Sequence, residues 1–259
     1  MISLLRSEFY QVRKALSIKI GFGIILIGSI IFGMQVTDPS YIEEIKEVDR
    51  LYQLYGSGAL ITAMSDGAMA LLIASLFAGW LISGGFENRV MQEAIAVGKR
   101  RLTVYSAKML TYLLVVTGLC VVYWVVTSLQ AFLKNGLGTR EICGNLCQVP
   151  YIIGMIFAAI LAYMSLFAFC GMIAFWSRRV GVTIGICLVA VLVGGNLLAS
   201  ILSEPILNLM NYTPFGLYNR VLKLDVAWTD IWLTAGISLL WIGIITTIGY
   251  LKFRKAELK

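Results

Sequence analysis

The sequence predicts an all-α polytopic membrane protein with six transmembrane helices. The chain of 259 residues is 59% hydrophobic and only 14% charged, whereas soluble proteins carry roughly 25% charged residues. Its apolar residues form six long runs, each close to the about 20 residues that a helix needs to cross the hydrocarbon core. The frequent glycines, 25 in all, suit close packing between such helices. We therefore expect a single transmembrane domain over residues 1–259.

The apolar runs also indicate the orientation of the chain. The six runs are Leu16–Val36, Gly67–Gly85, Met109–Leu133, Pro150–Trp176, Val180–Leu202 and Ile231–Leu251. With both termini inside, most of the 21 Lys and Arg residues fall in inside segments. Such an excess is typical of cytoplasmic loops, so we expect a multi-pass protein with both termini in the cytoplasm. A cleaved signal peptide is disfavoured, because no small-x-small site follows the first run.

The first fifteen residues, Met1–Ala15, favour an interfacial helix. An apolar stripe at helical spacing runs through Leu5, Phe9, Val12 and Leu16. The basic residues Arg6, Arg13 and Lys14 lie off this stripe and can contact lipid headgroups. A basic flank that only fixes the orientation of the first span is an equal and compatible interpretation.

The expected outside loop Thr37–Asp66 is acidic. It holds six acidic residues and two basic ones. We expect a solvated loop, with a short helix within Ile42–Tyr55 as a further possibility. Contact with a cationic substrate is the alternative.

The loop Lys134–Val149 carries two cysteines, Cys143 and Cys147. A C-x3-C pair can form a small disulfide in an oxidising compartment, and free thiols are the other interpretation. A structural zinc site is disfavoured, because the chain contains no histidine. The remaining cysteines, Cys120, Cys170 and Cys187, lie in apolar runs and are predicted to be small packing residues.

The basic segment Phe86–Arg101 separates the second and third runs. On a helical wheel, apolar residues of Phe86–Val97 occupy one arc and polar residues the other, which predicts an amphipathic helix that stops at Gly98. Glu87 breaks this pattern, because it falls within the apolar arc. A carboxylate there needs a protein partner, a basic group or water. The segment is therefore either a docking element or a surface helix with Glu87 paired to Arg89, Lys99 or Arg100.

Two features mark the last third of the chain. Asn196 follows two glycines inside the fifth run, where a packing hydrogen bond is favoured over a substrate contact. Ser203–Trp228 is semi-apolar and interrupted by prolines. Leu202–Leu209 and Tyr212–Leu224 are predicted to form a shallow re-entrant pair, which is tolerated only where protein or water covers its backbone.

Several kinds of chemistry have no counterpart in the sequence. There is no G-x-x-x-x-G-K-[ST] motif, so the chain has no P-loop of its own for ATP. Charges within the runs are sparse: Lys19 lies near an inner end, and Asp66 and Asp230 lie at outer ends. Ion-driven carriers usually need ionisable residues near the midplane. We therefore expect the energy source to lie outside the chain and no cofactor bound by it. The lack of histidine and of paired acidic residues within the runs also disfavours an intramembrane enzyme.

The arrangement resembles the membrane subunits of bacterial type-2 ATP-binding-cassette (ABC) exporters. Between the second and third spans such permeases carry an F-E/D-x-x-x pattern, then G-x-x-R, then a lysine at the third span. Here these residues are Phe86, Glu87, Gly98, Arg101 and Lys108. The resemblance implies a coupling helix at 86–101 that docks on the ATPase, with the coupling residues Phe86, Glu87, Arg89, Val90, Glu93, Gly98 and Arg101.

The resemblance also implies the partners of the chain. These are two copies of an ATPase subunit that holds ATP and Mg²⁺, a second permease subunit, identical or homologous, and the lipid of a bacterial plasma membrane. No nucleic-acid partner is expected. Many relatives provide immunity or resistance to peptide antibiotics, which suggests a hydrophobic peptide or another amphiphile as cargo. The alternative is a membrane scaffold or sensor subunit that binds a partner and transports nothing.

Overall fold

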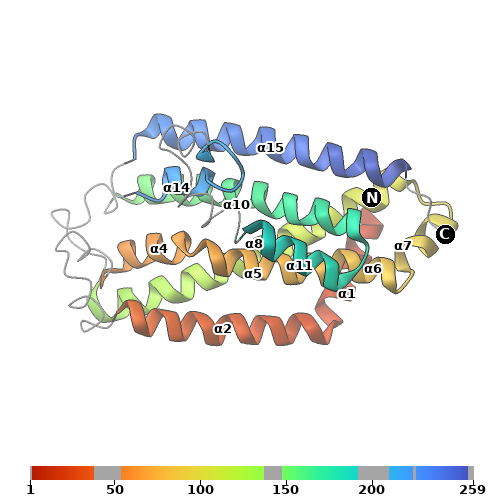
Figure 1. Cartoon of the computed structure of the whole chain (residues 1–259). Helices are drawn as coiled ribbons and strands as arrows, with labels where there is room; N and C mark the ends of the chain where they lie inside the picture. Colours follow the sequence, from red (N-terminus) through yellow and green to blue (C-terminus); the bar gives the residue numbers. More distant parts are fainter. Residues whose placement is uncertain (1, 38–53, 137–147, 192–209, 224–225, 256–259) are drawn as a thin grey trace.

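The computed structural model describes residues 2–37, 54–136, 148–191, 210–223 and 226–255. Within these ranges every regular element is helical, so the predicted all-α class is confirmed. The helices form one elongated bundle (Figure 1). The start of α1 (Ile2–Lys14) and the end of α15 (Trp228–Lys255) lie at the same end of this bundle.

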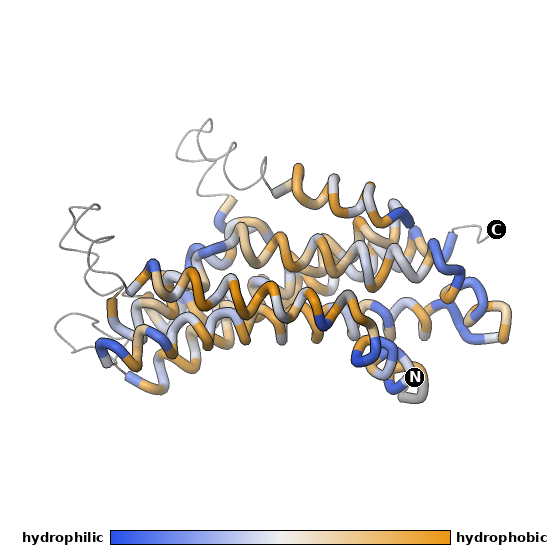
Figure 2. The backbone as a smooth tube through the Cα atoms, turned by 90° about the horizontal axis from the view of Figure 1, so that it is seen from below, coloured by the Kyte–Doolittle hydropathy of each residue, from blue (hydrophilic) through white to orange (hydrophobic). Residues whose placement is uncertain are grey.

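Five helical segments of the described residues are long and apolar enough to cross a membrane. They are Ile18–Val36 within α2 (Leu16–Val36), Gly67–Glu87, α8 (Arg101–Asn135), α10 (Val149–Ser177) and α15. Figure 2 shows hydrophobic residues along the length of these helices and hydrophilic residues mainly towards their ends. At 35 residues, α8 is about 50 Å long, which exceeds the roughly 30 Å of a hydrocarbon core.

The core of the bundle is built around α8 and α10. α10 packs along α15, and α8 packs along α2. The largest fully buried side chains include Tyr112, Tyr163, Phe77, Phe167 and Phe175. In contrast, α2 exposes large apolar side chains along its length: Ile20, Phe22, Ile24, Ile27, Ile30, Ile31 and Met34. An exposed apolar face of this extent is unusual for a monomer in water and suits contact with lipid.

The predicted outside loop Thr37–Asp66 is partly wrong. Residues 38–53, which include most of the expected helix Ile42–Tyr55, lie outside the described residues, but Gly56–Ser65 forms a buried helix, α4. α4 packs against α8, and a Cβ atom on Gly56 would lie only 2.9 Å from the Phe132 Cβ atom. A small residue such as Gly56 lets two helix backbones approach closely. The hydropathy of the sequence does not reveal this packing.

Asp66 is therefore not at the end of the bundle. It connects α4 to α5 (Gly67–Phe77) and caps α5, because its Oδ1 accepts a hydrogen bond of 3.2 Å from the Met69 N–H. The Tyr123 hydroxyl donates to the other carboxylate oxygen at 2.9 Å. Two polar partners from the chain thus satisfy a carboxylate that lies between two helical segments of the bundle.

The second span continues from α5 through a π-helical turn, η2 (Ala78–Ser83), into α6 (Gly84–Glu87). The hydroxyl of Ser83 lies 2.6 Å from the Thr183 hydroxyl and donates to the Ala174 carbonyl at 3.2 Å. π-helical turns are rare and often occur at functional sites. Here the turn places Ser83 against α10 and α11 (Val180–Val191).

The last third of the chain is described in parts. α11 begins at the end where α15 finishes, whereas α14 (Leu217–Val221) lies at the opposite end (Figure 1). α14 packs against α10 and α15. Asn196, Leu202–Leu209 and the second half of the predicted fifth span lie outside the described residues.

Candidate functional site

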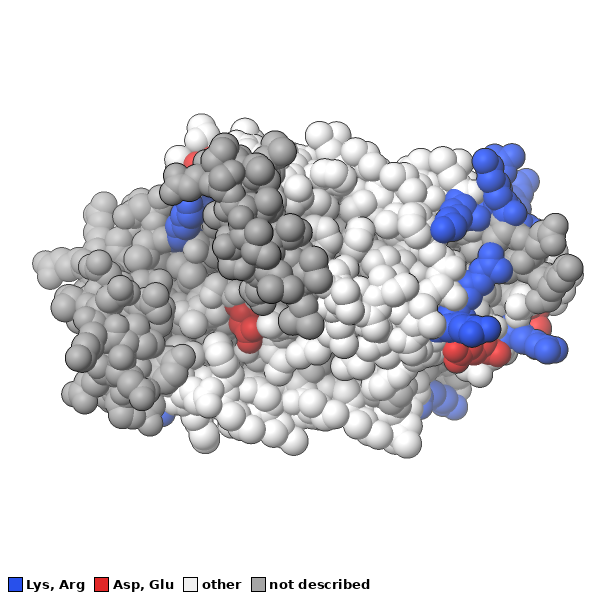
Figure 3. Space-filling model, in the orientation of Figure 1, with Lys and Arg blue, Asp and Glu red and all other residues white. Residues whose placement is uncertain are grey.

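Basic side chains gather at one end of the bundle, where α6, α8, α11 and α15 begin or finish (Figure 3). We call this the basic end; its cations include Lys99, Arg100, Arg101, Arg178, Arg179, Lys252, Arg254 and Lys255. Residues 84–100, here called the elbow, lie at this end and connect η2 to α8. The elbow contains most of the residues that the sequence singled out.

Phe86 fixes the elbow to the bundle. Its side chain is 5% exposed and packs edge-on against Phe175 of α10 and Phe253 of α15, with ring centroids 6.0 and 6.1 Å apart. The Arg178 guanidinium lies 5.8 Å from the same ring. Such edge-to-face pairs are each worth about 0.5–1.5 kcal/mol beyond simple burial. Phe86 is therefore an internal anchor and is not presented to solvent.

Glu87 is exposed, yet it has a partner within the chain. Its Oε1 accepts a hydrogen bond of 2.9 Å from the Val180 N–H, at the first residue of α11. A carboxylate at this position satisfies one of the unpaired N–H groups of the helix start and interacts favourably with the helix dipole. Glu87 thereby connects α6 to α11, which neither of the interpretations from the sequence included.

The predicted continuous helix Phe86–Val97 is wrong, because it breaks at Asn88 and Arg89. α6 ends at Glu87, Arg89 adopts a left-handed conformation with φ of 59°, and α7 (Val90–Ala96) starts afresh. A left-handed non-glycine residue costs roughly 1–2 kcal/mol. Anchoring of Phe86 and Glu87 on one side of the break offsets this cost, and a helical wheel cannot detect it.

The short helix α7 has a buried side and an exposed side. Met91 is 1% exposed and Val90 is half-buried, whereas Glu93 is exposed. The helix ends as predicted at Gly98, whose φ is 88°. The Gly98 N–H donates to the Ile95 carbonyl and the Lys99 N–H to the Ala94 carbonyl. This pair of bonds is the Schellman motif, in which glycine is favoured for its left-handed conformation.

Beyond α7 the surface of the elbow is apolar and basic. Val97 is 80% exposed, and Lys99 and Arg100 are exposed beside it. Arg101 begins α8, and its Nη1 donates a hydrogen bond of 2.7 Å to the Arg254 carbonyl at the end of α15. Arg101 thus connects the start of α8 to the end of α15.

One ion pair at this end was not predicted from the sequence. Lys108 of α8, only 7% exposed, donates to Glu8 of α1 at 2.5 Å. Both residues line a cavity of about 220 Å³ that also includes Trp80, Gly85 and Val90. The signal available in the sequence was that Glu8 is the only acidic residue before Asp38, and that Lys108 directly precedes the third apolar run.

The ion pair sets which face of α1 meets the bundle. Leu5, Glu8 and Val12 are half-buried, whereas Phe9 and Leu16 are 41% and 70% exposed. Part of the predicted apolar stripe, Leu5 and Val12, is therefore partly covered by the bundle, whereas Phe9 and Leu16 are exposed on its outside. A helix that carries exposed apolar and basic residues side by side still suits an interfacial position.

The cysteines fall into two groups. Cys120, Cys170 and Cys187 are buried free thiols, in agreement with their predicted packing role. Cys143 and Cys147 lie outside the described residues.

Comparison of the chain with protein-family models, with curated proteins and with solved structures finds no match.

Proposed function

We propose that this chain is the permease subunit of an ATP-driven ABC exporter and that the elbow docks the separate ATPase. The observation that carries the proposal is the elbow itself. It is a short helix with an exposed face at the basic end, attached to several helices of the bundle at once. A partner that moves α7 would therefore act on more than one span.

Three attachments support this coupling. Phe86 packs on α10 and α15, Glu87 accepts from the start of α11, and Arg101 joins α8 to α15. The exposed residues Arg89, Glu93 and Val97 are available for contact with the ATPase. ATP drives the cycle only if the ATPase binds it with different affinity in the two conformations of the complex.

The path of the chain is consistent with six crossings and cytoplasmic termini. The chain passes from the basic end at Val180 to the opposite end at Leu217 and then returns through α15 (Figure 1). Together with the five long segments, one crossing within this passage would give the six spans that we propose. An excess of Lys and Arg is typical of the cytoplasmic side of a membrane, so we assign the basic end to the cytoplasm.

In the proposed complex two permease subunits, identical or homologous, pack around a central pathway. The apolar surfaces of the spans suit a hydrophobic peptide, such as a peptide antibiotic or bacteriocin, or another amphiphile. Removal of such a molecule from the membrane would provide immunity or resistance. The competing function is a scaffold or sensor subunit that binds the same kind of partner without transport.

The test is co-purification of the full chain from its native membrane, followed by measurement of coupled ATP turnover. We expect a P-loop ATPase with the natural chain, and its loss with the exposed variants Glu93→Lys and Val97→Asp. Arg13→Glu reverses an equally exposed charge on α1 and should leave the complex intact. Glu87→Gln should keep the complex but reduce coupled turnover several-fold, because the bond to α11 is weakened.

The outcomes separate the two functions. Absence of any P-loop protein under gentle extraction would exclude the exporter. A bound ATPase whose turnover responds to no amphiphile would favour the scaffold or sensor. Loss of binding with Arg13→Glu as well would place the docking surface elsewhere.

A further inference from the structure

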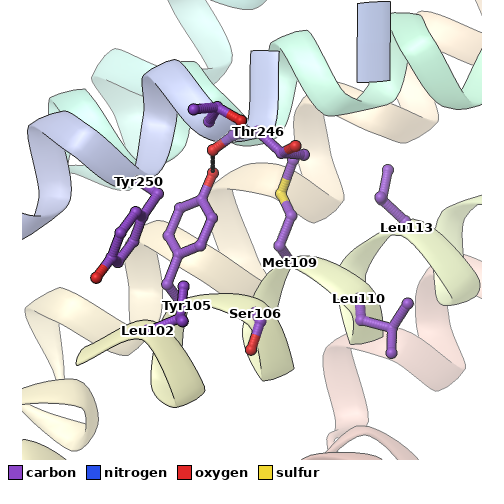
Figure 4. A pocket seen from close by; sticks show the side chains of 9 residues that line it. Leu102, Tyr105, Ser106, Met109, Leu110, Leu113, Thr246 and Tyr250 are labelled. Carbon is purple, nitrogen blue, oxygen red and sulfur yellow. Dashed lines mark hydrogen bonds between the residues drawn. The ribbon is translucent and has the colours of Figure 1, made fainter. Parts of the chain in front are cut away.

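An apolar groove opens between α8 and α15 near the basic end. Its volume is about 350 Å³, and nine residues line it (Figure 4). They are Leu102, Tyr105, Ser106, Met109, Leu110, Leu113, Thr246, Thr247 and Tyr250. The two helices are joined here by a hydrogen bond of 2.9 Å from the Tyr105 hydroxyl to the Thr246 carbonyl.

Most hydroxyl groups of the groove donate to carbonyls of the chain itself. The Thr246 hydroxyl donates to the Ile242 carbonyl and the Thr247 hydroxyl to the Gly243 carbonyl, at 2.6 and 2.7 Å. Ser106 donates to the Thr103 carbonyl at 3.3 Å. Apart from the Tyr250 hydroxyl, the walls therefore offer van der Waals contact without unpaired hydroxyl groups, which suits a hydrocarbon chain.

The groove leads directly to cations at the basic end. On α15 the lining residues Thr247 and Tyr250 share one helix face with Arg254, at spacings of three and four residues. On α8, Arg101 directly precedes the lining residue Leu102, and its guanidinium donates to the Arg254 carbonyl. Neither Arg254 nor Lys255 forms an ion pair with another residue that the structure describes.

We propose that this groove is a binding site for an anionic phospholipid. One acyl chain lies between α8 and α15, and the phosphate contacts Arg254 and Lys255. Basic pockets between transmembrane helices on the cytoplasmic side hold anionic headgroups in this manner. A second copy of the chain is a poorer occupant, because its own basic end would bring like charges together. The proposal does not depend on whether the chain belongs to an exporter.

The test is a titration of the purified full chain in detergent, followed by native mass spectrometry. The probes are phosphatidylglycerol and phosphatidylcholine with identical acyl chains. We expect the natural chain to prefer phosphatidylglycerol. The double variant Arg254→Gln/Lys255→Gln should lose roughly 5-fold in affinity for each cation removed, and only for the anionic lipid. Lys134→Gln/Lys223→Gln removes two exposed cations from the opposite end of the bundle and is the matched control.

A second pair of variants tests the acyl chain. Thr247→Trp fills the groove and should weaken binding of both lipids by at least 10-fold. Ile248→Trp adds the same bulk at the neighbouring residue, which is 45% exposed and does not line the groove, and should have no effect.

Each remaining outcome contradicts the proposal. Equal affinity for the two lipids would exclude a headgroup site at Arg254. Unchanged binding with Thr247→Trp would exclude the groove. A shift from dimer to monomer with Thr247→Trp, at unchanged lipid binding, would assign the groove to a second copy of the chain.

Discussion

The elbow and the far half of the bundle are held in place in different ways. Towards the opposite end, buried tyrosines connect the elements: Tyr163 donates to the Met64 carbonyl and stacks on Tyr218, with ring centroids 5.0 Å apart. At the basic end, the elbow is joined to α11 by a hydrogen bond at the surface, and Arg101, the residue just after it, is bonded to α15. Phe86 and Met91 are buried side chains of the elbow.

This difference has a mechanical consequence. Buried, close-packed aromatic contacts resist rearrangement, because any shift opens cavities or strains rotamers. Surface hydrogen bonds contribute only about 0.5–1.5 kcal/mol each and can be exchanged for water. The elbow is thus suited to move about the Phe86 anchor while the far half of the bundle keeps its shape.

The largest effect is expected at the Lys108–Glu8 pair, which is the buried ion pair of the basic end. Lys108→Met leaves the half-buried Glu8 carboxylate without its cation, and this should lower the free energy of unfolding by about 3 kcal/mol. The double variant Glu8→Gln/Lys108→Met should recover most of the loss, because no charge then remains buried. Thermal unfolding in detergent measures both. Equal melting of the single and double variants would show that the pair does not hold α1 on α8.

A somewhat smaller effect is expected at Asp66, in the far half. Asp66→Ala removes the cap of α5 and the acceptor of the Tyr123 hydroxyl. Together these losses should lower stability by about 2 kcal/mol. Tyr123→Phe removes only one of the two bonds and should cost about 1 kcal/mol.

Coupled ATP turnover tests whether the far half of the bundle, like the elbow, takes part in coupling. Since Asp66 lies far from the elbow, we expect coupled ATP turnover to stay unchanged with Tyr123→Phe at a temperature where the variant is folded. Turnover that falls with Tyr123→Phe, at unchanged melting, would show that the far half takes part in coupling.

The sequence predicts those parts of the fold that depend on local composition and on the spacing of apolar residues. The all-helical class follows from long apolar runs, and the end of α7 follows from Gly98, because glycine alone enters the left-handed region without strain. The packing role of the buried cysteines follows from their apolar surroundings. Each of these is a local property of the chain.

The parts that could not be predicted depend on contacts between distant segments. Val180 lies 93 residues from its acceptor Glu87, and Lys108 lies 100 residues from Glu8. The sequence assigns α4 to a loop because its 10 residues are too few to cross a membrane, and its packing on α8 depends on a segment far away in the sequence. The break at Arg89 depends on the anchoring of Phe86 and Glu87 to distant helices. Contacts between such distant residues can be recognised only when the fold is known.

The smallest effect, and the most direct test of a movable elbow, is expected at the two left-handed arginines. Arg89 and Arg178 have φ of 59° and 55°. Arg89→Gly removes the strain of this conformation and should raise the free energy of unfolding by up to about 1 kcal/mol. Arg178→Gly removes the same strain but also the contact with the Phe86 ring, worth about 0.5–1 kcal/mol, so its net effect should be near zero.

Thermal unfolding compares the two variants, and hydrogen exchange of the α7 amides reports the elbow directly. Because glycine also accepts many other conformations, Arg89→Gly should speed exchange in α7 even as it stabilises the whole chain. Arg178→Gly, which leaves the α6–α7 turn untouched, should not. Slower exchange in α7 with Arg89→Gly would mean that strain at Arg89 loosens the elbow in the natural chain. The elbow would then move by release of that strain rather than by rotation about Phe86.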